Sequence, residues 1–195
     1  MKIEICVKDT NSYQVVKDIF QDIPDIIVTN NTILNGIYST LISAGNSFAE
    51  MNGGVDGLIN THLSGYTPTM YIQQDVKNYI NKEFMGELPV GRSIVISTKH
   101  PRHTKLIYTP TMRVAEDVSS TLNAYLAFRG ALLLMKQNNI TAASTPIFCT
   151  GAGCMNLIKA CYQMKEAYKS VVEGNLIDKD WQYYHKNHRT LLSLS

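Results

Sequence analysis

The sequence predicts an α/β layer fold. Short runs rich in β-branched residues alternate along the chain with longer segments in which apolar residues recur at helical spacing. Two of the predicted strands run into glycine-rich segments that open onto helices. Because ligands of open α/β sheets bind beyond the carboxyl ends of the strands, both segments are expected to line one cleft.

Six short segments are predicted as strands, since each concentrates β-branched or aromatic residues between turn formers. The first, residues 2–7, alternates apolar and polar side chains and is predicted as an edge strand. The others are apolar runs such as Ile94, Val95 and Ile96. They cover residues 25–30, 40–43, 93–98, 105–109 and 142–148.

Six segments are predicted as helices from the spacing of their apolar residues. The first covers residues 12–21, with Asn11 or Ser12 as its cap. The longest covers residues 116–138. The remaining helices are predicted at residues 55–63, 70–83, 157–172 and 178–188.

Length and composition favour one globular domain, residues 1–195, with a helical and aromatic extension at about 173–195. Hydrophobic residues make up 45% and charged residues 17% of the chain, and the net charge of +2 gives no signal for nucleic acid or an anionic membrane. No apolar run approaches the roughly 20 residues of a membrane span, and Glu4 interrupts the start. We expect a cytoplasmic protein whose four cysteines are buried or loop thiols, with neither metal nor cofactor.

The first glycine-rich segment covers residues 43–57 and joins a strand to a helix. Gly53 and Gly54 permit a close approach of backbone to a ligand, and amides at the helix start favour an anion. Asn46 offers a donor and an acceptor to a sugar, while Asp56 falls in the first helical turn. Spacing alone slightly favours an ordinary glycine turn, with Asn46 as turn former and Asp56 as helix start.

The second glycine-rich segment, residues 150–156, reads Thr-Gly-Ala-Gly-Cys-Met-Asn and follows another strand. Its successive amides can form a nest for a phosphate. The segment is neither a P-loop, since no Gly-Lys-Ser/Thr follows, nor a full dinucleotide fingerprint, since the third glycine is missing.

Together the two segments resemble the macrodomain family. Asn46-Ser47 followed by Gly53-Gly54-Val55-Asp56-Gly57 is similar to the Asn-Ser…Gly-Gly-Val-Asp-Gly segment of that family, and residues 150–153 are similar to its later phosphate loop. A divergent bacterial and phage branch is more similar still, and shares Phe48 and Met51 as well as residues 86–91, 110–113, 163–164 and 167–168. The resemblance extends from about residue 26 to residue 168.

The resemblance implies a three-layer α/β/α sandwich with a mixed central sheet, and a ligand of the ADP-ribose type. It implies that Asn46 holds hydroxyls of the distal ribose and that Asp56 orients a water or a hydroxyl, which makes these two residues the catalytic candidates. Amides of the second segment would wrap the diphosphate, and Arg113, which follows a strand, would pair with a phosphate. The full set of implied ligand-binding residues is Ser43, Asn46, Ser47, Gly53, Gly54, Val55, Thr32, Ile33, Thr150, Gly151, Ala152, Gly153, Cys154, Met155 and Arg113.

Several positions depart from the family pattern. Thr32 stands where the family has an Asp that contacts the adenine amino group, and Ser43 replaces the first Asn of its Asn-Ala-Ala-Asn run. Asn52 replaces an Asp before the two glycines. These changes concern catalysis more than binding, so the resemblance leaves the enzyme question open.

Two further clusters are interpreted without function. The turn from His100 to His103 is basic, but no further ligand for a metal is evident, so a surface turn is expected. The aromatic cluster from Trp181 to His185 is expected to pack the tail onto the domain.

Three functions remain open at this stage. The first is hydrolysis of ADP-ribosyl groups on proteins or of ADP-ribose 1″-phosphate. The second is binding without turnover, with free ADP-ribose, an ADP-ribosylated protein, or a cyclic or otherwise modified ADP-ribose as the ligand. A phage-like protein could use such a site to sequester an NAD-derived immune signal. The third is a structural module with a vestigial cleft. We rank binding of an ADP-ribose-type ligand first, with no membrane partner and no strong nucleic-acid signal.

Overall fold

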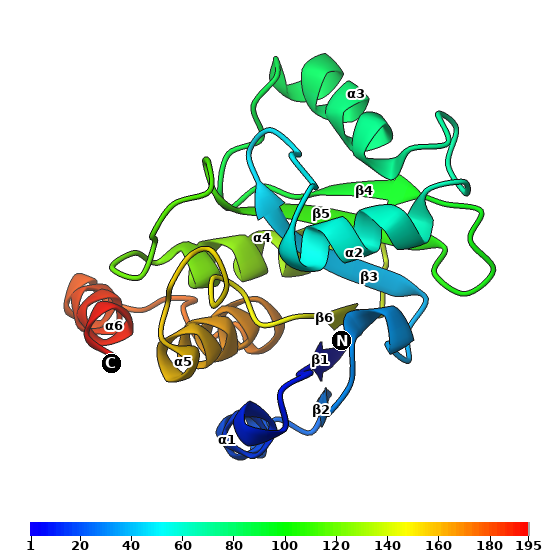
Figure 1. The fold of residues 1–195 in the computed structure, drawn as a ribbon. Coiled ribbons are helices and arrows are strands. Elements are labelled where there is room, and N and C mark those ends of the chain that lie inside the picture. Colours follow the sequence, from blue (N-terminus) through cyan, green and yellow to red (C-terminus); the bar gives the residue numbers. More distant parts are fainter. Residues whose placement is uncertain (195) are drawn as a thin grey trace.

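The computed structural model describes residues 1–194 and confirms the α/β class. Six strands form one sheet in the order β2-β1-β6-β3-β5-β4 (Figure 1). Strand β4 is antiparallel to β5 and the other pairs are parallel, so the sheet is mixed as expected. The strands are β1 (Lys2–Cys6), β2 (Ile26–Thr29), β3 (Thr40–Asn46), β4 (Ile94–Ser97), β5 (Lys105–Met112) and β6 (Ala142–Thr145).

Helices cover both faces of the sheet and complete the three layers (Figure 1). They are α1 (Thr10–Phe20), α2 (Gly54–Leu63), α3 (Ile72–Phe84), α4 (Asn123–Gln137), α5 (Leu157–Tyr168) and α6 (Trp181–Ser193). A 3-10 turn, η1 (Ile33–Asn35), precedes β3, and a π-helical turn, η2 (Lys169–Glu173), continues α5. No helix in residues 1–194 is long and apolar enough to cross a membrane.

The two faces of the sheet carry separate apolar cores. Helices α1, α4 and α5 pack against one face, and α2 and α3 against the other. Neighbouring residues of one strand serve opposite cores: Leu41 belongs to the core of α2 and α3, and Ile42 to the core of α1, α4 and α5. This alternation with a period of two is what a sheet covered on both faces requires.

The expectation that residues 2–7 form an edge strand is wrong. Strand β1 lies between β2 and β6, and four of its five residues are buried. The alternation came from Glu4, whose carboxylate is buried because it accepts hydrogen bonds from Thr29 Oγ1 (2.8 Å), Ser144 Oγ (2.5 Å) and the Ile37 amide (2.6 Å). A charged residue that finds three donors can occupy an interior strand.

Several predicted boundaries also move. The longest helix begins at Asn123 instead of residue 116, since the segment before it makes a turn in which the Val118 amide donates to the Gly153 carbonyl (3.0 Å). Helix α1 is capped by Asp9, whose carboxylate accepts from the Ser12 amide (2.8 Å), and neither Asn11 nor Ser12 is its cap. The last helix is longer than predicted and ends at Ser193.

The tail is anchored by an aliphatic residue and not by its aromatic cluster. Trp181 is 73% exposed, whereas Leu191 is 2% exposed in the contact between α6 and α5. Two polar side chains of α5 complete the contact: Lys159 Nζ donates to the Leu192 carbonyl (2.8 Å) and Gln163 Nε2 to the Leu191 carbonyl (3.2 Å). Helix α6 thus lies beside α5, well away from α3 (Figure 1).

Candidate functional site

The two glycine-rich segments meet at a point where the chain leaves neighbouring strands in opposite directions. Strands β3 and β6 are parallel neighbours. The chain after β3 leads to α2 on one face of the sheet, and the chain after β6 leads to α5 on the other face. Such divergent connections open a crevice at the carboxyl edge of a sheet, which is where ligands of this fold class bind.

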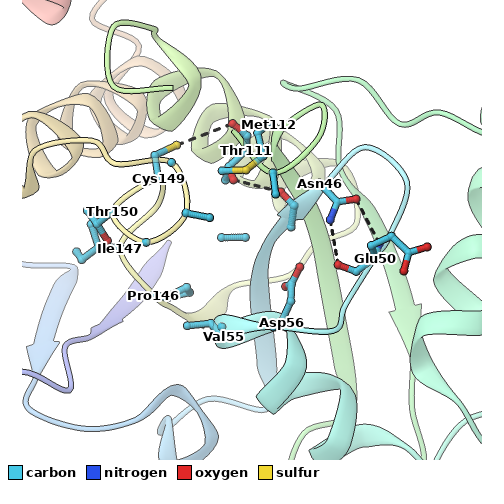
Figure 2. A pocket seen from close by; sticks show the side chains of 18 residues that line it. Asn46, Glu50, Val55, Asp56, Thr111, Met112, Pro146, Ile147, Cys149 and Thr150 are labelled. Carbon is cyan, nitrogen blue, oxygen red and sulfur yellow. Dashed lines mark hydrogen bonds between the residues drawn. The ribbon is translucent and has the colours of Figure 1, made fainter. Parts of the chain in front are cut away.

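A cavity of about 470 Å³ occupies this crevice. Both segments line it: Gly53, Gly54 and Asp56 from one side and residues 150–153 from the other (Figure 2). A second cavity of about 240 Å³ lies next to it, bounded by η1 and the start of α1. The two cavities share four lining residues, so they form one cleft with two compartments; the shared residues are Val55, Pro146, Ile147 and Thr150.

The start of α2 presents free backbone amides to the larger compartment. Its N-cap is Gly53, which has no side chain to cap the helix. The amides of Gly54, Val55 and Asp56 have no acceptor among the described residues, as is usual in a first helical turn. Gly54 has φ +55°, a left-handed conformation that glycine adopts without strain. An anion is therefore favoured at this end of the cleft.

The loop after β6 presents a second set of amides. Those of Thr150, Gly151, Ala152 and Gly153 find no acceptor among the described residues. Helix α5 does not supply amides in the same way, because Asn156 caps it by accepting from the amides at 158 and 159.

A glycine is required at position 153 by close packing. A Cβ there would lie 2.7 Å from the Cys149 carbonyl oxygen and 2.8 Å from Val118 Cγ2. Gly151 differs, since a Cβ would meet nothing within 4 Å. Gly153 therefore shapes the loop, and Gly151 borders the open space of the cleft.

Asp56 is buried at the wall of the larger compartment. Its carboxylate accepts a hydrogen bond from Ser43 Oγ, and burial raises its pKa to about 6 although this bond acts in the opposite direction. A Cβ on Gly45 would lie 2.6 Å from Asp56 Oδ2, so only glycine leaves room there. A carboxyl group that is partly ionised near neutral pH can accept or donate a proton in the cleft.

Asn46 is largely engaged within its own loop. Its Nδ2 donates to the Glu50 carbonyl (2.9 Å), and its Oδ1 accepts from the amides of Phe48 (3.1 Å) and Glu50 (3.2 Å) (Figure 2). The side chain lines the cavity with one N–H left for a ligand. Asn46 therefore stabilises the turn, as the ordinary-turn interpretation predicts, and it also lines the cleft.

Tyr108 organises the same corner and carried no signal in the sequence. Its hydroxyl donates to the Asn46 carbonyl (2.8 Å) and accepts from the Asn46 amide (3.1 Å), while its ring is fully buried in β5. The β3–β5 register shifts between Gly45 and Asn46 at this point. Tyr108 replaces the regular ladder there and so fixes where the first segment leaves the sheet.

The structure brings most of the predicted site residues to the cleft. Those that line the larger compartment are Asn46, Gly53, Gly54, Val55, Asp56, Thr150, Gly151, Ala152 and Gly153. Thr32 and Ile33 line the smaller one. Four predicted residues stand behind or beside the walls: Ser43 and Ser47 are buried, as is Met155, and Cys154 is exposed.

Arg113 points away from the cleft. Its Nε and Nη2 donate to the Glu87 carboxylate (2.8 and 3.1 Å), and its guanidinium lies 5.1 Å from the centre of the Phe48 ring. Arg113 lines neither compartment. The guanidinium of Arg113 therefore has its partners, the Glu87 carboxylate and the Phe48 ring, at the protein surface.

Other lining residues were not predicted. The segment that follows β6 contributes Pro146, Ile147 and Cys149, and the end of β5 contributes Thr111 and Met112. The first three directly precede the second glycine-rich segment, and their position could have indicated them. The remaining unpredicted lining residues of the larger compartment are Ala44, Gly45, Glu50 and Ala115.

Comparison with known proteins agrees with this geometry. The family model described as "Macro domain" matches residues 42–164, which is more than half of the chain and includes both glycine-rich segments. The chain belongs to the Macro domain family. None of the curated proteins gave a match.

Solved macrodomains share the fold. The macrodomain of Mycobacterium tuberculosis DarG is 15% identical, with a TM-score of 0.59 over 71% of this chain and 86% of that one. An Oceanobacillus iheyensis macrodomain mutant solved with ADPR is 24% identical, with a TM-score of 0.59 over 70% of this chain and 72% of that one. Thermosipho africanus DarTG in complex with ADP-ribose is 14% identical, with a TM-score of 0.56 over 87% of this chain and 50% of that one.

Proposed function

We propose that this chain binds ADP-ribose or a nucleotide derived from it in the two-compartment cleft. The observation that carries the proposal is the pair of free amide sets, at the start of α2 and in residues 150–153, on opposite sides of one cavity. A diphosphate between them would accept hydrogen bonds from both sides without any basic side chain. This matches a chain whose Arg113 is paired elsewhere.

The compartments on either side suit the two ends of such a ligand. The smaller one, beside η1, offers Asn31, Thr32 and the apolar Ile33 to a nucleobase. The larger one offers Asp56 and the remaining N–H of Asn46 to ribose hydroxyls. A volume of some hundreds of Å³ is usual for a site that encloses a small molecule. An Oceanobacillus iheyensis macrodomain mutant has been solved with ADPR and Thermosipho africanus DarTG with ADP-ribose, which favours the same ligand here.

Calorimetric titration with ADP-ribose tests the proposal on the wild type and on Gly151→Glu. A Cβ at this position would meet no atom within 4 Å, so we expect the variant to fold, while its carboxylate would repel a diphosphate held by the adjacent amides. We expect saturable one-to-one binding by the wild type and loss of at least about 100-fold in affinity in the variant, a change of roughly 2.7 kcal/mol.

A matched control adds the same charge elsewhere. Gln182→Glu on the exposed face of α6 should bind as the wild type does. Equal loss in both variants would point to net charge and not to the loop, and absence of binding by the wild type to ADP-ribose, ADP and cyclic ADP-ribose alike would refute the proposal.

A second candidate is hydrolysis in the same cleft, favoured by Asp56. A carboxyl group with a pKa of about 6 at the cavity wall is mostly ionised at pH 7 and can take a proton from an attacking water.

Binding without turnover, as in sequestration of an NAD-derived signal, is favoured instead by the engagement of Asn46 in its own loop. The wild type and Asp56→Ala should be assayed on an ADP-ribosylated protein and on ADP-ribose 1″-phosphate. Turnover that Asp56→Ala abolishes supports hydrolysis, and binding with no turnover of either substrate supports sequestration.

A further inference from the structure

Three histidines that are distant in sequence meet at the end of α2 opposite the cleft. His62 lies in the last turn of α2, and His100 and His103 lie in the connection between β4 and β5. His62 Nε2 and His103 Nδ1 are 2.8 Å apart, and one nitrogen from each of the three rings can be chosen so that all lie within 4.8 Å of one another. The expectation that no further ligand lies near this turn is therefore wrong, because α2 supplies a third imidazole. Pro101 and Arg102 are exposed as expected of a surface turn, but His103 is fully buried.

The environment keeps these rings neutral. Burial lowers the pKa of His103 to about 4. The pKa values of His62 and His100 are also lowered, mainly by burial and to a smaller extent by nearby positive charge. The Arg102 guanidinium contributes to all three shifts. Neutral imidazole is the form that coordinates a metal ion.

The cluster also contains a buried polar atom without a partner. His103 Nε2 is buried and forms no hydrogen bond of regular geometry within the described residues, although the Gly36 backbone raises the pKa of this ring as a hydrogen-bond acceptor does. Its Nδ1 faces His62 Nε2, so a single proton lies between these two nitrogens and belongs to one ring or the other. A cation in that position would be bound by both inner nitrogens, and the proton between them would move to an outer nitrogen. Each ring would then carry its proton on the outer nitrogen, which in His103 is the buried Nε2.

We propose that His62, His100 and His103 bind one divalent transition-metal ion such as Zn²⁺, with a fourth position open to water. Tetrahedral zinc with Zn–N bonds of about 2.0–2.1 Å places its ligand nitrogens about 3.3 Å apart. The nitrogens of His62 and His103 would separate by only about half an ångström to reach this spacing. Three imidazoles and a water form a known type of zinc coordination.

His100 requires the largest adjustment. Its Nδ1 accepts hydrogen bonds from the amides of Arg102 (3.2 Å) and His103 (3.0 Å), and coordination by this ring means giving up or rearranging these bonds. Arg102 also opposes a cation electrostatically, and its guanidinium is fixed near the cluster by hydrogen bonds to the carbonyls of Asn35 and Gly36 (2.8 and 3.0 Å). His100 is therefore the weakest of the three ligands, and His62 and His103 dominate the affinity.

The site is separate from the nucleotide cleft. His62 is eight residues after Gly54 along α2, about 12 Å at 1.5 Å per residue. A metal there would join the end of α2 to the β4–β5 connection, two segments otherwise linked by side-chain contacts of these rings. It would stabilise the folded state by binding to it and not to the unfolded chain.

The test titrates Zn²⁺ into the chelator-treated full chain by calorimetry, counts bound metal after gel filtration, and records the visible spectrum with Co²⁺. We expect one ion per chain, a Co²⁺ spectrum of tetrahedral type, and a higher Tm with Zn²⁺. His62→Ala should weaken binding about 100-fold or more and abolish the rise in Tm, since loss of outer-shell partners alone costs 10–100-fold. His100→Ala should have a smaller effect than His62→Ala.

Two controls separate this cluster from adventitious binding. His188→Ala removes an exposed histidine of α6, and Cys154→Ser removes the exposed thiol. Both should bind one Zn²⁺ as the wild type does. The proposal is overturned if the wild type takes up no stoichiometric metal, if His62→Ala binds Zn²⁺ as tightly as the wild type does, or if either control loses the bound ion. Circular dichroism of each variant shows that the fold is retained.

Discussion

At the scale of single residues, Asp56 is held in a position that favours its neutral form. It is buried beside the cavity, and within the described residues the Ser43 hydroxyl is its one side-chain hydrogen-bond donor. No basic side chain in residues 1–194 compensates its charge, which is why burial dominates its pKa. A buried carboxylate without a compensating positive charge lowers the stability of the folded protein and is more reactive in proton transfer. This combination is frequent at functional sites.

The pH dependence of stability follows from this shift. Because the pKa of Asp56 rises from 3.8 to about 6 on folding, its stabilising protonation is complete below pH 3.8 and lost as the pH rises through 6. We predict that Asp56→Asn is more stable than the wild type at pH 7.5 by on the order of 1–3 kcal/mol, and that this advantage shrinks at pH 4.5. Urea unfolding at the two pH values measures it.

Asp9 provides a control, because its pKa is shifted in the opposite direction from that of Asp56. Hydrogen bonds from Ser12 lower the pKa of this exposed cap, so its contribution is lost as the pH falls. The difference in unfolding free energy between Asp9→Asn and the wild type should therefore become smaller at low pH. An Asp56→Asn advantage that is the same at pH 4.5 and 7.5 would contradict the burial of a proton-binding carboxylate.

At the scale of elements, α4 packs against the chain at a point where only a glycine fits. A Cβ on Gly130 would lie 2.4 Å from the Gly91 carbonyl oxygen, and Gly91 itself has φ +91° in the turn before β4. Neither partner is a flexible side chain, so the helix or the turn has to move. This contact fixes the depth at which α4 lies on the sheet.

We predict that Gly130→Ala destabilises the protein by about 1–3 kcal/mol despite the better helix propensity of alanine. Gly151→Ala is the matched control, because its Cβ meets nothing within 4 Å and its cost should stay within about 0.5 kcal/mol. Chemical denaturation of both variants decides it, and equal stability of the two would mean that α4 and the turn adjust freely.

Element types followed from the sequence, and several of their roles did not. All six strands and six helices were predicted near their observed positions, because period-two and helical spacing are local properties. The interior place of β1 was missed because Glu4 resembles a solvent-facing residue until Thr29, Ser144 and Ile37 are known to surround it. The late start of α4 was missed because the Val118 turn depends on Gly153.

At the scale of the whole molecule, the C-terminal extension is joined to the fold through α5. Leu191 is buried between α6 and α5, while Lys159 and Gln163 of α5 are themselves buried and donate to carbonyls at the end of α6. Removal of α6 would leave the buried Lys159 ammonium without its acceptor, whereas Gln163 Nε2 would keep its hydrogen bond to the Thr121 carbonyl (2.9 Å). The extension is thus part of the support of α5, the helix that follows the second glycine-rich segment.

We predict that Leu191→Ala costs about 2–4 kcal/mol in unfolding free energy, since it opens a cavity under α6. Trp181→Ala should cost no more than about 0.5 kcal/mol, because that side chain is mostly exposed. Thermal and urea unfolding compare the two, and a larger cost for Trp181→Ala would mean that the aromatic cluster anchors the tail after all.

The sequence by itself determined the α/β class, the two glycine-rich segments, their order and their positions after strands, because these depend on local spacing and on glycine's backbone freedom. Only the tertiary structure decided which side chains meet across the chain. It placed Tyr108 against Asn46, paired Arg113 with Glu87 and added His62 to the turn that holds His103. Such contacts depend on how the strands are ordered in the sheet and on which face each helix covers, and no local pattern encodes either.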